Sequence, residues 1–203
     1  MCHLQGLDQG AIEGELESVR RQRALSPGIA FNEWPVPFLI DYIQALHHAY
    51  VRGTGSALAT HLHEFVKGHL KKYPYLADVE EAFDALLKKV TEHMQEEEET
   101  VFPYLRQVWS AHLNRDAYGQ LFMRTLGKPL RPVGEDHNRI APVLKQLRSL
   151  TNHYAFGEGA CTNHQVLYHK LREFDEDLVQ HLHLERNVLY PKVLELEKEL
   201  RAL

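Results

Sequence analysis

The chain has 203 residues, of which 44% are hydrophobic and 25% are charged, and its formal net charge is −5. This length suits one well-buried domain and is short for two. Because a mildly acidic protein gains little from counterion release on a phosphate backbone, nucleic acid is a poor candidate partner. No apolar run is long enough for a membrane span, and the first residues lack the basic stretch and apolar core of a signal peptide. We therefore expect a cytoplasmic protein with no membrane partner.

The segments between the clusters of Pro and Gly are long and show helical periodicity. β-Branched residues are sparse and do not alternate with polar ones, so strand signatures are absent. The sequence thus predicts an all-α protein, with an N-terminal extension of residues 1–33 followed by one domain of residues 34–203. Within that domain we expect four main helices, at about residues 36–70, 75–108, 130–153 and 160–200.

The second and fourth expected helices carry the same pattern. In each, apolar residues recur at steps of three and four, and the stripe that they form is interrupted by a histidine and, four residues later, by a glutamate. The first pair is His93 and Glu97, and it recurs 88 residues later as His181 and Glu185. Each copy also ends on an aromatic residue followed by proline, as Phe102-Pro103 and Tyr190-Pro191.

This placement of His and Glu favours a metal site. An imidazole and a carboxylate on a stripe that faces the core cost free energy unless they pair with each other or bind a metal ion. A single such pair would be explained by a hydrogen bond between the two side chains. Two copies at equivalent positions of a repeat shift the balance towards one shared metal centre.

Each copy needs a further ligand from a neighbouring helix. The third helix offers His137, which interrupts another apolar stripe. In the first helix, the periodicity points to His47 almost as well as to its neighbour His48. The spacing between the repeats favours His48, which lies 89 residues before His137, but both histidines stay open as candidates.

The collected set of candidate ligands is His48, His93, Glu97, His137, His181 and Glu185. Mixed imidazole and carboxylate ligands on bundle helices suit iron or manganese, whereas the thiolates of a structural zinc site are missing. The two carboxylates can each bridge two metals, so that each metal takes two histidines and a share of both bridges. We expect two iron ions per chain, joined by an oxo or hydroxo bridge, with a position open at each iron for a small ligand.

Two other metal-binding patterns are excluded. Ferritin-like carboxylate proteins use Glu-x-x-His, but apolar residues stand three positions before the two repeated histidines, Val90 and Leu178. The zinc-protease motif His-Glu-x-x-His does not occur in the sequence.

Five segments carry a family resemblance: LIDYIQALHHAY, TEHMQEEEETVFP, GEDHNRIAPVLKQLRSLTNHY, ACTNHQVLY and HLHLERNVLYP. They cover most of residues 34–195 and resemble hemerythrin-like (HHE) cation-binding domains. More closely, they resemble the repair-of-iron-centres family of di-iron proteins, which is linked to nitric-oxide and oxidative stress. The resemblance implies a hemerythrin-like up-and-down four-helix bundle. Carried over by motif, it implies four histidine ligands and two bridging glutamates, namely His48, His93, His137, His181, Glu97 and Glu185.

The same resemblance favours His48 over His47 and implies a function. A member of this family would take part in the repair of iron–sulfur clusters damaged by nitric oxide or oxidative stress, by donating iron. Its partners would be damaged iron–sulfur proteins, with nitric oxide or dioxygen as small ligands. Two alternatives at the same site stay open: an enzyme that reduces nitric oxide, and a sensor that binds nitric oxide or dioxygen. Whether the protein is an enzyme, and whether it forms a homodimer, also stays open.

Two departures from known relatives matter. Oxygen-carrying hemerythrins place an extra histidine one turn after the third-helix ligand, where this chain has Ala141, and this argues against an oxygen carrier. Members of the repair family usually have an N-terminal module with a Cys-Cys-Gly-type motif, which Cys2-His3 does not reproduce. We therefore expect residues 1–33 to be a truncated remnant of that module.

Overall fold

The computed structural model describes residues 29–114 and 130–202, and of residues 130–136 it describes the backbone alone. The chain divides into two units, Met1–Glu33 and Trp34–Leu203. The described part of the first unit ends in a short 3-10 helix, η2 (Phe31–Glu33). The expected remnant of an N-terminal module stays a prediction, since most of residues 1–33 lies outside the described ranges.

Four long helical stretches make up the described part of the second unit, close to the four that the sequence predicts. They are α2 (Val36–Tyr42), η3 (Ile43–His48) and α3 (Ala49–His69); α4 (Leu76–Glu96), η4 (Glu97–Val101) and α5 (Phe102–Asn114); α7 (Leu130–Leu150); and α8 (Thr162–Leu184), η5 (Glu185–Leu189) and α9 (Tyr190–Ala202). Within the described ranges there is no strand, so the all-α prediction is confirmed.

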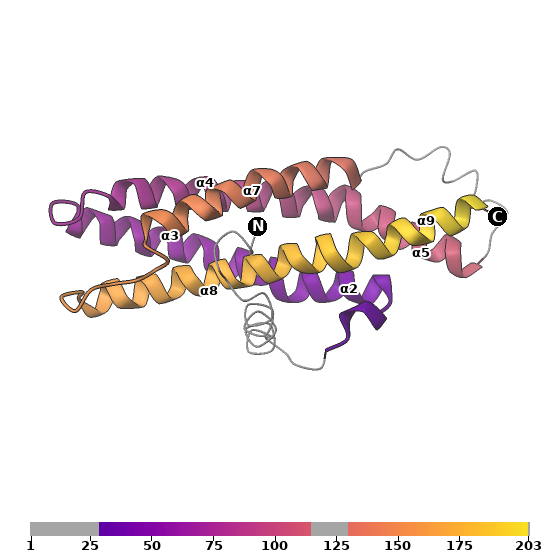
Figure 1. Ribbon diagram of the computed structural model, residues 1–203, viewed down its shortest axis with the longest axis horizontal. Coiled ribbons are helices and arrows are strands. Elements are labelled where there is room, and N and C mark those ends of the chain that lie inside the picture. Colours follow the sequence, from indigo (N-terminus) through magenta and orange to yellow (C-terminus); the bar gives the residue numbers. More distant parts are fainter. Residues whose placement is uncertain (1–28, 115–129, 203) are drawn as a thin grey trace, which may run out of the picture. The chain divides into compact units, whose positions relative to one another are not determined.

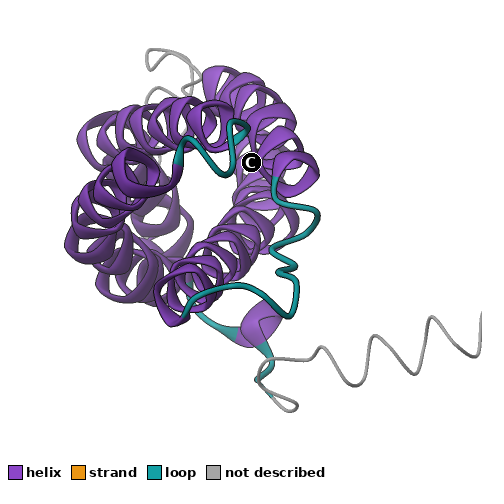
Figure 2. Ribbon diagram, turned by 90° about the vertical axis from the view of Figure 1, so that its left-hand side faces the viewer, coloured by secondary structure: helices purple, strands orange, loops and turns teal. Residues whose placement is uncertain are grey.

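The stretches pack side by side as a helical bundle, the architecture that the resemblance implies. Helix α3 packs against α4 and α8, and α4 packs against α7, while α5 packs against α9 and α2 towards the other end. The connections from α3 to α4 and from α7 to α8 lie at the same end, on the left in Figure 1. Figure 2 looks along the bundle from that end and shows the helices arranged around a common interior.

The core is formed by the apolar stripes that the sequence shows at steps of three and four. Residues such as Leu62, Phe83, Leu86, Phe174 and Leu178 are at most 1% exposed. The rings of Phe83 and Phe174 meet edge to face, with centroids 5.3 Å apart. Burying a side chain of this size stabilises the fold by roughly 1.5–3 kcal/mol. The same stripes therefore hold the bundle together and aim the interrupting histidines and glutamates inward.

Helix α3 runs without a break through Gly53 and Gly55. At Gly55 the absence of a side chain lets α3 approach α4 closely. A Cβ atom there would lie 2.5 Å from Cδ1 of Leu87, nearer than side-chain atoms normally come. The glycine therefore serves the packing of two helices rather than a bend.

Three of the four stretches contain a π-helical segment: η3, η4 and η5. A π segment carries one more residue per turn than the α-helix around it and occurs often at functional sites. η4 begins at Glu97, η5 begins at Glu185, and η3 ends at His48. Each of these three positions belongs to the predicted metal site. The sequence pattern does not predict these segments.

The connection between α7 and α8 is held by a buried polar group. Three successive residues, Asn152 to Tyr154, adopt left-handed backbone angles, with φ between 47° and 61°. The Tyr154 hydroxyl donates a hydrogen bond of 2.8 Å to Asp175 on α8, which also accepts two hydrogen bonds from Arg148 on α7. Asp175 is 4% exposed, so these contacts fix a strained turn to the helix that follows it.

None of the described helices is long and apolar enough to cross a membrane.

Candidate metal centre

All six residues that the sequence predicts as ligands lie together in the interior of the bundle. They occupy the end of η3 (His48), the last turn of α4 (His93), the start of η4 (Glu97), the middle of α7 (His137), the last turn of α8 (His181) and the start of η5 (Glu185). Each is at most 4% exposed. The π-helical segments thus supply or adjoin five of the six positions.

The six side chains form two overlapping groups. The first group is His48, His181, Glu97 and Glu185, and the second is His93, His137, Glu97 and Glu185. In each group, one nitrogen or oxygen atom from every residue lies within 4.8 Å of the others. Because both glutamates belong to both groups, the arrangement fits two metal positions that share two carboxylates.

Glu185 presents one oxygen to each group. Its Oε1 lies 2.6 Å from Nε2 of His181, in the first group. Its Oε2 lies 3.1 Å from Nε2 of His137 and 3.3 Å from Nε2 of His93, in the second group. The carboxylate therefore spans the two candidate positions.

Glu97 presents a single oxygen to both groups. Its Oε2 lies 3.4 Å from Nε2 of His48 and 3.4 Å from Nε2 of His93. Its other oxygen, Oε1, faces away and accepts a hydrogen bond from the hydroxyl of Tyr190. The two shared carboxylates are therefore placed differently.

The donor atoms fit a pair of iron ions. Oε2 of Glu97 and Oε1 of Glu185 are buried and accept no hydrogen bond from a described residue, although imidazole nitrogens surround them. Buried carboxylate oxygens in that condition cost free energy, which a cation between them would offset. Four imidazoles and two carboxylates are also ligands that iron accepts readily.

The electrostatics of the cluster move the pKa values of His48 and Glu185 in opposite directions. Burial alone would lower the pKa of His48, but contacts with three glutamates outweigh burial and raise the pKa to about 10. These glutamates are Glu185, Glu97 and Glu98. Burial alone would raise the pKa of Glu185, but the surrounding histidines, His181 foremost, lower it well below its ordinary value. At neutral pH Glu185 is therefore ionised, and the proton on His48 competes with a metal ion.

The comparison with known proteins agrees with this geometry. The hemerythrin HHE cation-binding domain matches residues 39–193, a range that includes all six residues of the two groups. This chain belongs to the hemerythrin HHE cation-binding domain family.

Within this family, the chain is similar to proteins that carry a more specific name. Two of them are the iron-sulfur cluster repair protein YtfE of Yersinia pseudotuberculosis serotype IB (strain PB1/+) and that of Yersinia pestis (strain Pestoides F). Each is 26% identical to this chain over 188 residues, which cover 93% of this chain and 78% of the relative. The resemblance to the repair-of-iron-centres family, expected from the sequence, is thereby confirmed.

The structure separates the two candidates from the first helix of this hemerythrin domain. His48 points Nε2 into the cluster, whereas His47 belongs to neither group. Nδ1 of His47 donates a hydrogen bond of 2.8 Å to Asp177. The ring of His47 lies parallel to that of His181, with an angle of 2° and centroids 5.6 Å apart. His47 thus packs behind a candidate ligand rather than beside the candidate metal positions.

Glu98 and Arg52 support His48 in a way that the sequence did not reveal. Nδ1 of His48 donates a hydrogen bond of 2.6 Å to one oxygen of Glu98, and Arg52 donates one of 2.6 Å to the other. Such outer contacts fix which ring nitrogen faces a metal. In the acidic run from Glu96 to Glu99, spacing distinguishes Glu97 alone, so no sequence signal marks Glu98.

Tyr190 makes the other contact with the cluster that the sequence pattern does not predict. Its ring lies against His137, with centroids 6.1 Å apart, and its hydroxyl reaches Glu97. A signal was present in the repeat, since Phe102 stands at the equivalent position and has no hydroxyl. The hydroxyl that distinguishes Tyr190 from Phe102 has a role only in the folded protein, where it reaches Glu97.

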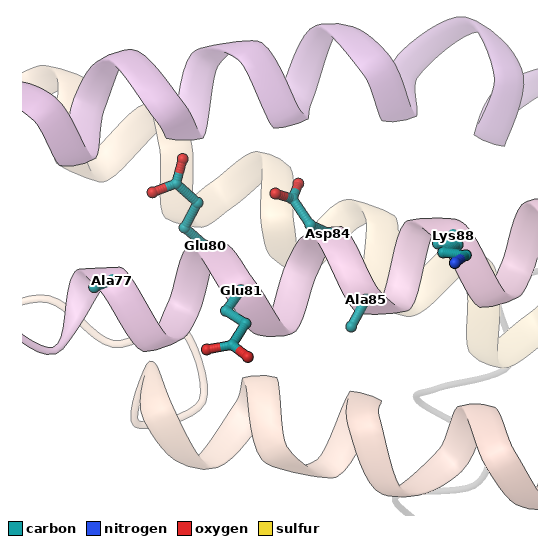
Figure 3. Close-up of a pocket in the computed structure, with 6 residues that line it drawn as sticks. All are labelled: Ala77, Glu80, Glu81, Asp84, Ala85 and Lys88. Carbon is teal, nitrogen blue, oxygen red and sulfur yellow. The ribbon is translucent and has the colours of Figure 1, made fainter.

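A hollow on the surface of α4 is separate from this centre (Figure 3). It is lined by Ala77, Glu80, Glu81, Asp84, Ala85 and Lys88. Glu80 is hydrogen-bonded to His63 over 2.6 Å. None of the lining residues belongs to either His and Glu group, so the hollow contributes nothing to the candidate metal centre.

Proposed function

We propose that this protein is a di-iron protein that helps to repair iron–sulfur clusters damaged by nitric oxide or oxidative stress, and that it acts by donating iron. The observation that supports this most is the pair of buried groups that share Glu97 and Glu185. The similarity to proteins named for iron-sulfur cluster repair supports the biological role. The identity of 26% supports the role at the level of the family, so iron donation is a proposal for this chain.

The six residues would hold two irons. His48 and His181 would bind the first, His93 and His137 the second, and both glutamates would bridge them, with an oxo or hydroxo bridge as a further expectation. When bound, the pair supplies iron that can change oxidation state and leave for a client. The protein keeps this pair in an interior where every ligand side chain is nearly inaccessible to water.

The surrounding residues have definable roles in this proposal. Glu98 and Arg52 hold His48 with Nε2 facing the first position. Glu97 and Glu185 each lie one turn beyond the histidine of the same helical stretch and begin a π segment there. We further propose that the protein acts in the cytoplasm, with damaged iron–sulfur proteins as partners and nitric oxide or dioxygen as small ligands.

The test of repair uses a purified iron–sulfur enzyme inactivated by nitric oxide. The iron-loaded protein is mixed with that enzyme under anaerobic conditions, in the presence of a chelator that captures free ferrous iron. We expect recovery of enzyme activity well above that given by the metal-free protein. A Glu97→Ala variant should give no recovery, and a Glu197→Gln variant, altered at a buried glutamate outside the cluster, should match the unaltered protein.

Other outcomes of the same test oppose iron donation. Nitrous oxide formed over several turnovers with a reductant, without recovery of the client, would assign nitric-oxide reduction instead. Reversible binding of nitric oxide or dioxygen with neither turnover nor recovery would assign a sensor. Size-exclusion chromatography with light scattering tests whether the active form is a homodimer.

A further inference from the structure

We propose that Tyr190 is a positioning residue that makes the two shared glutamates bridge differently, with Glu185 using one oxygen for each metal and Glu97 using Oε2 alone. The inference depends on the di-iron centre of the proposed function and does not depend on cluster repair. It deepens that proposal by naming a residue that controls how firmly iron is held.

The four carboxylate oxygens of Glu97 and Glu185 are placed differently relative to the two groups. Glu185 points Oε1 at His181 and Oε2 at His137, so its two oxygens serve different groups. Oε2 of Glu97 serves both groups, at 3.4 Å from His48 and 3.4 Å from His93. An oxygen equidistant from one histidine of each group is placed to lie between the two metals.

A contact with Tyr190 holds Oε1 of Glu97 away from both groups. Oε1 accepts the hydrogen bond of the Tyr190 hydroxyl. Tyr190 is 9% exposed and is the first residue of α9, directly after the π segment that Glu185 begins. The segment that places one bridging carboxylate therefore also places the hydroxyl that restrains the other.

The internal repeat shows that this restraint acts on one side of the centre. Phe102 follows the π segment of Glu97 as Tyr190 follows that of Glu185. The ring of Phe102 stacks on His48 with centroids 5.6 Å apart, much as the ring of Tyr190 stacks on His137. Because Phe102 has no hydroxyl, it cannot offer Glu185 the hydrogen bond that Tyr190 gives to Glu97.

The chemical consequence is weaker donation by Glu97. A hydrogen bond to Oε1 draws negative charge away from the metals and holds Oε1 towards Tyr190, away from a second metal contact. Each iron then shares one oxygen of Glu97 instead of having an oxygen of its own. One oxygen shared by two irons donates less charge to each iron than two separate oxygens would, so the centre releases iron more readily, which suits a protein that donates it.

The test is the variant Tyr190→Phe, which keeps the ring and removes the hydroxyl. The Phe102 position shows that a phenylalanine ring fits against a cluster histidine in this fold. We expect two irons per chain to remain and their release to a ferrous chelator to slow by about tenfold. This size is the lower end of the effect that outer contacts have on metal affinity, with the opposite sign here because the hydrogen bond that is removed competes with the metals for Glu97. Infrared difference spectra of protein labelled with ¹³C at the glutamate carboxylates, loaded minus metal-free, should show the Glu97 bands moving towards those of a carboxylate that uses both oxygens.

The matched control is Tyr104→Phe. The Tyr104 hydroxyl donates a hydrogen bond of 2.6 Å to Glu197, and both residues are buried outside the cluster. This variant loses the same chemistry at similar burial, and it should leave the release rate and the loaded-minus-metal-free spectrum unchanged.

Several results would overturn the inference. One is release of iron from Tyr190→Phe that is as fast as from the unaltered protein, or faster. Another is a set of carboxylate bands that does not change. A third is the loss of iron from Tyr190→Phe while its circular dichroism shows a folded bundle. Release to a chelator needs no damaged cluster. A failure of repair would therefore leave this result standing, and a failure here would leave repair standing.

Discussion

The Nε2 atoms of His48 and His181 lie 3.0 Å apart in the interior of the bundle. The two histidines are 133 residues apart in the chain and lie on different helices. Two ring nitrogens at this distance repel unless a proton or a metal ion lies between them. Since the pKa of His48 is raised to about 10, a proton takes this place when no metal does. The same nitrogen is the one that faces the first candidate metal position.

Iron binding should therefore release protons. His48 is charged at pH 7 in the metal-free protein and must lose a proton to bind iron, so calorimetry in buffers of different ionisation enthalpy should show about one proton released at this residue. The apparent affinity should rise between pH 7 and 9. Equal heats in all buffers would contradict the assignment of His48.

The metal-free protein should lose stability at alkaline pH. The pKa of His48 is higher in the folded state than the ordinary value of 6.5, so its contribution is fully present below pH 6.5 and is lost as the pH rises through about 10. Its thermal midpoint should fall between pH 7 and 10, while that of the iron-loaded protein should fall much less. A flat profile for the metal-free protein would show that the histidine is neutral there.

Removal of a shared glutamate should empty the centre. Glu185→Ala deletes a ligand from both groups, so iron measured by mass spectrometry should fall from two per chain to well below one. Glu197→Gln, at a buried glutamate whose side chain contacts Tyr104 and Arg201, should keep two irons. A single zinc in the unaltered protein would reject the di-iron assignment.

Loss of the Glu98 carboxylate should weaken iron binding without removing a ligand. Glu98 accepts a hydrogen bond from His48. Burial alone would raise the pKa of Glu98, but the contacts with Arg52 and His48 outweigh burial and lower it, so Glu98 is ionised at neutral pH. Glu98→Gln should reduce iron affinity by about 10- to 100-fold in competition with a chelator. Glu99→Gln, at an exposed neighbour, should have no effect. Equal losses in the two variants would indicate a general charge effect.

The hydrogen bonds between Arg148 of α7 and Asp175 of α8 should contribute to stability and not to iron binding. Arg148→Ala removes two hydrogen bonds from Asp175, a nearly buried carboxylate, and should lower the free energy of unfolding by about 2 kcal/mol, less than for a fully buried pair because Arg148 is partly exposed. Lys198→Ala, which breaks an exposed ion pair, should cost about 0.5 kcal/mol or less. Denaturant unfolding measures both, and iron content should not change in either.

The sequence alone determined the helices and most of the centre. Helical period and the interval between histidine and glutamate are local properties, so His93 with Glu97 and His181 with Glu185 could be placed on inward faces without knowing the fold. The repeat and the stripe added His137. Residue spacing could not decide between His47 and His48, because neighbouring residues on a helix point about 100° apart and the apolar face of a helix is about that wide or wider.

The tertiary structure decided what depends on residues far apart in the chain. His47 turns to Asp177, which is 130 residues away, and Tyr190 reaches Glu97, which is 93 residues away. The π segments that begin at Glu97 and at Glu185 are also absent from the sequence pattern. Chain periodicity fixes which face of a helix is buried, but contact between distant helices fixes which atom of a buried side chain meets which partner.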